Sequence, residues 1–209
     1  MPVLSSKYFY ESFLLAAIDK LSEKLSRLSG ACGRGLTLNR ECGESLGIFL
    51  IDTLNAAANV PQFSRLKEMA RQLNAKIALA GEFITPFNAE ICPQCNSVCC
   101  LNKFGCYDFD DLIYMGALGC HKDEFISFAN NAPEDLPCRY LTQTGCTISR
   151  QLRPFRCNWF FCAPLVQHME NGSMKAYRGF NRLFQEIIRL RKDMLDEFSA
   201  AINILSGAV

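Results

Sequence analysis

The stretch CPQCNSVCC, residues 92–100, concentrates cysteines in the middle of the chain. So dense a run is typical of a disulfide knot, a redox pair, a zinc site or an iron–sulfur cluster. One C-x2-C turn supplies only a pair of ligands, so a closed metal site needs sulfur from a second segment. A second cysteine group follows at residues 138–162, with Cys106 and Cys120 between the two groups. The two groups together supply the predicted metal ligands Cys92, Cys95, Cys99, Cys100, Cys138, Cys146, Cys157 and Cys162.

The composition favours a metal or catalytic use of these thiols over structural disulfides. Of the 209 residues, 49% are hydrophobic, which is enough for an apolar core without covalent help. The first residues, MPVLSSKYFYESF, lack the basic start and apolar run of a secretory signal. The longest apolar stretch, LGIFLIDTL, is broken by Asp52 and is too short to cross a bilayer. We therefore expect a cytoplasmic protein without membrane association, in a compartment where disulfides are rare.

The charge gives no sign of a partner. The formal net charge is +1, from 22 basic and 21 acidic side chains, whereas nucleic-acid binders carry a basic excess or patch. One local basic run, RLFQEIIRLRK at residues 182–192, mixes cations with apolar residues at helical spacing. Such a run is typical of the solvated face of an amphipathic helix. No nucleic-acid partner is expected, and other partners stay unknown.

The hydrophobic spacing predicts a mainly α fold. Three helices are expected over about 5–29, 44–58 and 61–80, the last starting at Pro61 and ending at Gly81. Between about 87 and 168 come ten of the twelve cysteines and only short helical patterns, at 108–119 and 121–131. Apolar residues recur at helical spacing again over 174–205, which predicts a long final helix. We expect a helical body (1–86), a cysteine-rich, loop-dominated metal-binding insertion (87–168) and a C-terminal helix (169–209) that packs on the body in one compact domain.

The cysteine spacing resembles that of the YkgJ-type cysteine-cluster family, a zinc- or iron-chelating domain. The resemblance covers about residues 88–165 and includes DDLIYM (110–115), which is similar to the Asp-led helix of the family. The chain departs from the family pattern at Asn96, Ser149 and Asn158, where Gly, Tyr and Arg are usual. The flagellin lysine methylases carry a similar cysteine arrangement, but no glycine-rich nucleotide-binding loop is found here. The matching positions are Cys92, Cys95, Cys99, Cys100, Cys138, Leu141, Cys146, Ile148, Arg153, Pro154 and Cys157.

Other residues near the cysteines have two interpretations each. Arg153 is the candidate cofactor-binding residue because it could donate hydrogen bonds to thiolate or cluster sulfurs; the alternative is a surface ion pair. His121 and His168 are expected to be polar surface residues rather than ligands. The aromatic run at 159–161 would shield a cluster from water or simply pack in the core. A thioredoxin-like pair at Cys92 and Cys95 lacks the expected strand–turn–helix context.

The ligands favour an iron–sulfur cluster over zinc. The side chains of adjacent residues diverge, so Cys99 and Cys100 suit two centres, or two irons of one cluster, better than one small tetrahedral ion. The expected function is a metal-binding protein that holds an iron–sulfur cluster or zinc, with a redox role. The alternatives are a metal-dependent enzyme, methyltransferase-like or oxidoreductase, and a zinc-stabilised interaction module. No nucleophile–base pair, phosphate loop or carboxylate pair stands out, so no catalytic residue is assigned. Cys32 and Cys42 are predicted not to be ligands.

Overall fold

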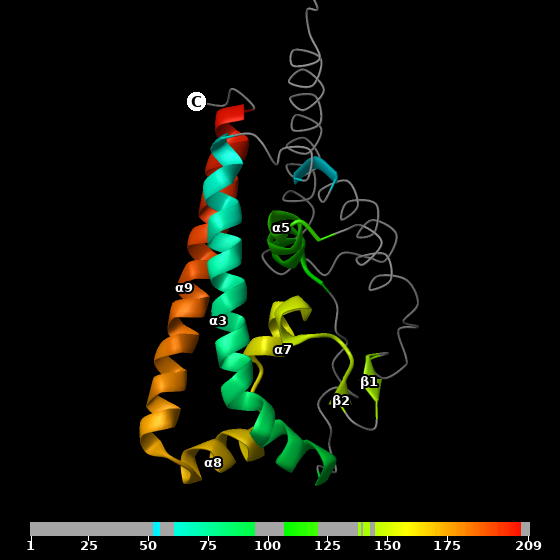
Figure 1. The fold of residues 1–209 in the computed structure, drawn as a ribbon, viewed down its shortest axis with the longest axis vertical. Helices are drawn as coiled ribbons and strands as arrows, with labels where there is room; N and C mark the ends of the chain where they lie inside the picture. Colours follow the sequence, from blue (N-terminus) through cyan, green and yellow to red (C-terminus); the bar gives the residue numbers. More distant parts are fainter. Residues whose placement is uncertain are drawn as a thin grey trace, which may run out of the picture. The chain divides into compact units, whose positions relative to one another are not determined.

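The computed structural model describes residues 52–54, 61–94, 107–120, 138, 140–142 and 145–205 (Figure 1). These residues are mainly helical, as predicted, with one antiparallel pair of two-residue strands. The expected helices over 5–29 and 121–131 lie outside the described residues, and of 44–58 only the helical residues 52–54 are described. The elements are α3 (Pro61–Ile91), η2 (Cys92–Gln94), α5 (Phe109–Leu118), β1 (Leu141–Thr142), β2 (Gly145–Cys146), η3 (Arg150–Leu152), α7 (Phe155–Trp159), α8 (Ala163–Asn171) and α9 (Met174–Leu205).

Helix α3 begins at Pro61, as predicted, but it does not end at Gly81. It continues to Ile91 with Pro86 inside it. Gly81 is buried within the helix, and a Cβ added there would lie 3.0 Å from Cδ of Arg150. The glycine therefore makes space for an arginine side chain instead of stopping the helix. Pro86 removes one backbone hydrogen bond without ending the helix, and the helix bends toward its C-terminal end (Figure 1).

The described chain forms two compact units. The first unit comprises residues 1–69, 108–128 and 193–209, and the second comprises 70–107 and 129–192. The start of α3, up to Met69, and the end of α9, from Asp193, belong to the first unit. The rest of both helices belongs to the second unit. All described candidate metal ligands belong to the second unit. The domain boundaries expected after residues 86 and 168 stay predictions.

The first unit contains α5, which confirms the helix predicted over 108–119. Its start is fixed by a capping box: Oδ1 of Asp108 accepts from the backbone N–H of Asp111 at 2.8 Å, and Oδ2 of Asp111 accepts from that of Asp108 at 3.2 Å. Its end is the left-handed Gly119, with a φ of 81°. The Phe109 and Phe198 rings lie 6.3 Å apart, centre to centre. The helix packs through Leu112, Ile113, Met115 and Ala117, all buried.

The second unit has a core between α3 and the first part of α9. Phe83 and Phe180 stack with ring centres 4.6 Å apart, and Lys76 Nζ lies 2.6 Å from Glu186 Oε2. Helix α9 confirms the predicted range, and Ile187 is buried on its apolar face. The following residue, Ile188, is 50% exposed, because each residue points about 100° further around the helix than the one before it.

None of the helices in the described ranges combines the length and apolar character that a bilayer crossing requires.

Candidate metal centre

The predicted ligands that the structure describes come from several short elements. Cys92 is the first residue of η2, directly after α3, and Cys146 is the last residue of β2. Cys157 lies inside α7, and Cys162 is the N-cap of α8. Cys92 and Cys157 are exposed, whereas Cys138, Cys146 and Cys162 are partly buried, and all five are thiols. Cys95, Cys99 and Cys100 lie outside the described residues.

A small hairpin holds two of these thiols. Its strands pair Leu141 with Cys146, and the backbone N–H of Leu141 donates to the carbonyl of Cys138 at 2.9 Å. The backbone N–H of Thr147 donates to the carbonyl of Tyr140 at 2.8 Å and extends the pairing. Residues 138 and 146 are therefore fixed relative to each other by backbone hydrogen bonds.

Arg153 connects this hairpin to α7. Its Nε donates to the carbonyl of Ile148 at 2.9 Å, and its Nη2 lies 3.5 Å from the carbonyl of Cys146. The next residue, Pro154, is buried and accepts from the backbone N–H of Cys157 at 2.8 Å. Within the described ranges Arg153 binds backbone carbonyls instead of forming the surface ion pair considered above. Its predicted hydrogen bonds to sulfur stay a prediction.

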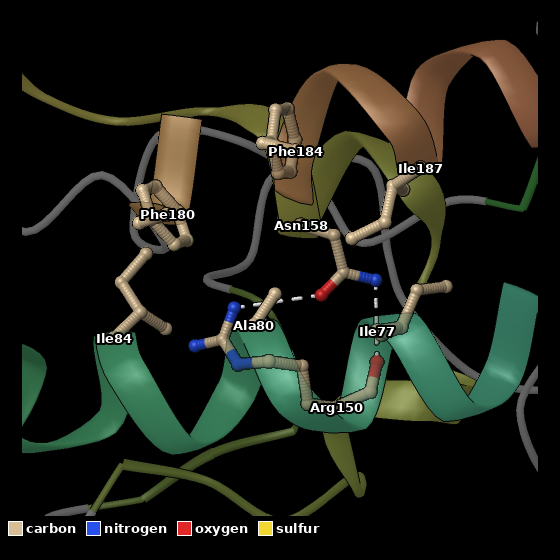
Figure 2. A pocket seen from close by; sticks show the side chains of 8 residues that line it. All are labelled: Ile77, Ala80, Ile84, Arg150, Asn158, Phe180, Phe184 and Ile187. Atoms are coloured by element: carbon tan, nitrogen blue, oxygen red, sulfur yellow. Dashed lines mark hydrogen bonds between the residues drawn. The ribbon is translucent and has the colours of Figure 1, made fainter. Parts of the chain in front are cut away.

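Arg150 is a residue that the sequence reasoning missed. Its Nη1 donates to Oδ1 of Asn158 at 3.4 Å, and Nδ2 of Asn158 donates back to the Arg150 carbonyl at 3.2 Å (Figure 2). Both residues line a hollow between α3 and α9 that has room for little more than a water molecule. In the sequence, the only indication was Asn158, which departs from the family pattern. Its hydrogen-bond partner could not be inferred from the sequence. The other lining residues are Ile77, Ala80, Ile84, Phe180, Phe184 and Ile187.

Three predicted ligands act on this arginine. Burial, together with the charge of Arg153, lowers the pKa of Arg150 to about 10, while Cys146, Cys157 and Cys92 act in the opposite direction. These cysteines come from β2, α7 and η2. That the two cysteine groups meet at one site stays a prediction.

The donor set has the chemistry of a soft-metal site. Thiolates suit zinc and iron–sulfur clusters, and the described thiols are exposed or only partly buried. Among the described residues, no three side chains of Cys, His, Asp or Glu are grouped closely enough to hold a metal ion. Three of the eight predicted ligands belong to residues 95–100, which the structure does not describe.

The other candidates have separate surroundings. His168 Nε2 lies 3.0 Å from Glu90 Oε2, and its ring meets the Phe87 ring edge-on at 5.7 Å. Phe161 packs against Phe180 and Phe184 in the core of the second unit, with ring centres 5.6 and 5.3 Å away. Its neighbour Trp159 is 50% exposed. His121 lies outside the described residues.

Cys120 belongs to the first unit. Its backbone N–H donates to the carbonyl of Met115 at 3.1 Å, just past the end of α5. Burial raises the pKa of Tyr114, and the nearby Cys120 and Asp111 raise it further. Cys120 thus lies just past the end of α5 in the first unit, whereas the described candidate ligands belong to the other unit.

No family model, curated protein or solved structure matches the chain. The resemblance to the YkgJ-type cysteine-cluster family thus rests on the cysteine spacing given above and stays an expectation. The candidate site has to be judged from its own residues.

Proposed function

We propose that this chain is a metal-binding protein whose clustered cysteine thiolates hold an iron–sulfur cluster or zinc. The observation that carries the proposal is the accessibility of clustered cysteines on three different elements: Cys92 and Cys157 are exposed, and Cys146 is only partly buried. Single buried thiols often serve only as small apolar side chains. Three thiols from three segments, two of them exposed, are not explained by packing.

The local structure supports ligands that are held in place. Backbone hydrogen bonds fix the hairpin with Cys138 and Cys146, and Arg153 joins that hairpin to the segment that leads into α7. Ligands need such support because a metal binds tightly only where its donors are held near their final geometry. A metal would then cross-link elements that are otherwise joined by loops.

An iron–sulfur cluster is the favoured group, and it would give the protein a redox role. The reason is the adjacent pair Cys99–Cys100, which serves two irons of one cluster more easily than one zinc ion. Cytoplasmic location and the absence of a nucleic-acid partner belong to the same proposal.

Purification without oxygen, followed by iron, sulfide and zinc analysis and an absorption spectrum, tests the proposal. The expected result is a coloured protein with bound iron and sulfide, and the double variant C146S/C157S should lose both the colour and the metal. The matched control is C32S/C42S, which also removes two thiols and should keep the metal.

Two outcomes would count against this proposal in different ways. A colourless anaerobic protein with stoichiometric zinc would refute the iron–sulfur cluster and leave a thiolate site. A wild-type protein without any bound metal, or C146S/C157S with a full complement, would refute the thiolate site itself.

A further inference from the structure

The first half of α9 exposes a row of cations on one side of the helix. Residues 174–192 contain six basic side chains and a single acidic one, Glu186. Four of the basic side chains, Lys175, Arg178, Arg182 and Arg189, are exposed. A rotation of about 100° per residue places these four within about 60° of one another, over about 21 Å of the helix axis. These four residues form a basic stripe.

The other sides of this part of α9 are occupied by contacts within the second unit. Phe180, Phe184 and Ile187 line the hollow beside α3 (Figure 2). Glu186 binds Lys76 of α3, with 2.6 Å between Oε2 and Nζ. Among the residues that the structure describes, no carboxylate forms an ion pair with the basic stripe. The charge of the stripe is therefore available to a partner.

The basic stripe does not stabilise the helix that holds it. The N-terminus of a helix favours acidic side chains, but the first turn of α9 has none and contains Lys175. The turn is capped by Ser173 instead, whose Oγ accepts from the backbone N–H of Ala176 at 3.4 Å. Arg178 and Arg182 are four residues apart, a spacing at which like charges repel each other. Helix stability thus gives no reason for the stripe, whereas recognition of an anionic partner does.

Two apolar side chains beside the stripe favour a protein as that partner. Met174 and Ile188 are 51% and 50% exposed. Helical geometry places both on the flank of the stripe opposite Glu186. Protein interfaces are enriched in Arg and Met and bury apolar contacts, which a phosphate backbone does not offer. The net charge of +1 also lacks the basic excess that is typical of nucleic-acid binders.

We propose that the basic stripe, with Met174 and Ile188 beside it, is the docking surface for an acidic helix of another protein. The four cations are separated by three, four and seven residues. Carboxylates at i, i+3, i+7 and i+14 of a helix laid alongside would match them, because both helices have the same rise per residue. The exposed Asp193 and Asp196 follow the stripe in α9 and would repel an acidic partner that extends further. The inference does not depend on the proposed metal site.

Fluorescence anisotropy of a labelled helical peptide tests this surface. The peptide is alanine-based, with Glu at i, i+3, i+7 and i+14 and Leu along one flank, and a scrambled peptide has the same composition. The full-length protein should bind the first peptide more tightly, and the affinity should fall as salt is added. R182Q/R189Q should weaken binding about 2- to 30-fold, as expected for the loss of two exposed ion pairs. The matched control R65Q/R71Q removes two exposed arginines of α3 and should bind as the wild type does.

The remaining outcomes assign the surface to other partners. Equal binding of the two peptides, or wild-type affinity in R182Q/R189Q, would overturn the inference. Tighter binding of a DNA duplex or of phosphatidylserine vesicles would also overturn it and would assign the stripe to phosphates. A dimer that R182Q/R189Q abolishes would replace the acidic partner by a second copy of this chain. A protein without metal that still binds the peptide would refute the proposed function and leave this inference standing.

Discussion

Two glycines inside helices, Gly81 and Gly116, are explained by the side chains packed against them and not by turns. Gly81 accommodates the Arg150 side chain, and Gly116 in α5 accommodates Leu54: a Cβ on Gly116 would lie 2.6 Å from the Leu54 Cδ1. Leu54 is only 2% exposed and has little room to move. A glycine inside a helix lowers the helix propensity, but at such a contact it allows the neighbouring side chain to pack closely.

We predict that G116A destabilises the protein although alanine is the better helix former. Overpacking a buried contact costs about 1–3 kcal/mol, which exceeds the gain of about 1 kcal/mol in helix propensity. The matched control is G179A in α9, where no heavy atom lies within 4 Å of the added Cβ. That variant should be stabilised by about 0.5–1 kcal/mol. Urea unfolding checks both, and a stabilised G116A would contradict the proposed contact with Leu54.

At the scale of elements, the packing of α3 on α9 in the second unit combines an aromatic core with an ion pair at its edge. Phe155 of α7 also packs against α9. Its ring stacks on that of Phe184 with ring centres 6.5 Å apart, and the guanidinium carbon of Arg191 lies 4.5 Å from the centre of the Phe155 ring. Lys76 and Glu186 join the two helices on the solvent side. The hydrogen bond from Lys76 lowers the pKa of Glu186, and the nearby Arg189 and Arg182 lower it further.

We predict a pH-dependent effect of E186Q. A carboxyl group with a lowered pKa in the folded state stabilises the fold above its ordinary pKa, and this contribution is lost as the pH falls through the lowered value. E186Q should therefore be less stable than the wild type at pH 7, and the difference should shrink below about pH 4.5. The effect is small and weaker in high salt, because both side chains are partly exposed. In the K76M background E186Q should change stability much less; an undiminished effect would exclude Lys76 as its cause.

At the scale of the whole molecule, the sequence predicts the secondary-structure elements better than it predicts the side-chain contacts between them. Helices α5 and α9 follow from apolar periodicity and, for α5, from an N-terminal Asp and a C-terminal Gly. The predicted end of α3 at Gly81 was wrong because the reason for that glycine lies at Arg150, far along the chain. Arg150 was missed for the same reason: in the sequence it is one surface-like arginine among many. The cysteine spacing predicts a site, but it does not predict which residues of other elements lie beside the cysteines.

The last prediction concerns metal removal and the second unit. Cys92 follows α3, Cys146 ends the hairpin and Cys157 lies in α7, so a shared metal would cross-link segments that are otherwise joined by loops. A metal that binds only the folded state stabilises it, and its removal should favour local opening of the segments that it joins. Limited proteolysis without oxygen, read by mass spectrometry, should therefore cut more within residues 92–162 after a chelator has removed the metal.

Two variants make this test specific. C146S/C157S should be cut within 92–162 with or without the chelator, because it holds no metal to lose. C32S/C42S should respond as the wild type does, since those thiols are predicted not to bind. If the metal is removed from the wild type and the cutting pattern stays the same, the metal does not join these segments. The cysteine groups would then belong to separate sites.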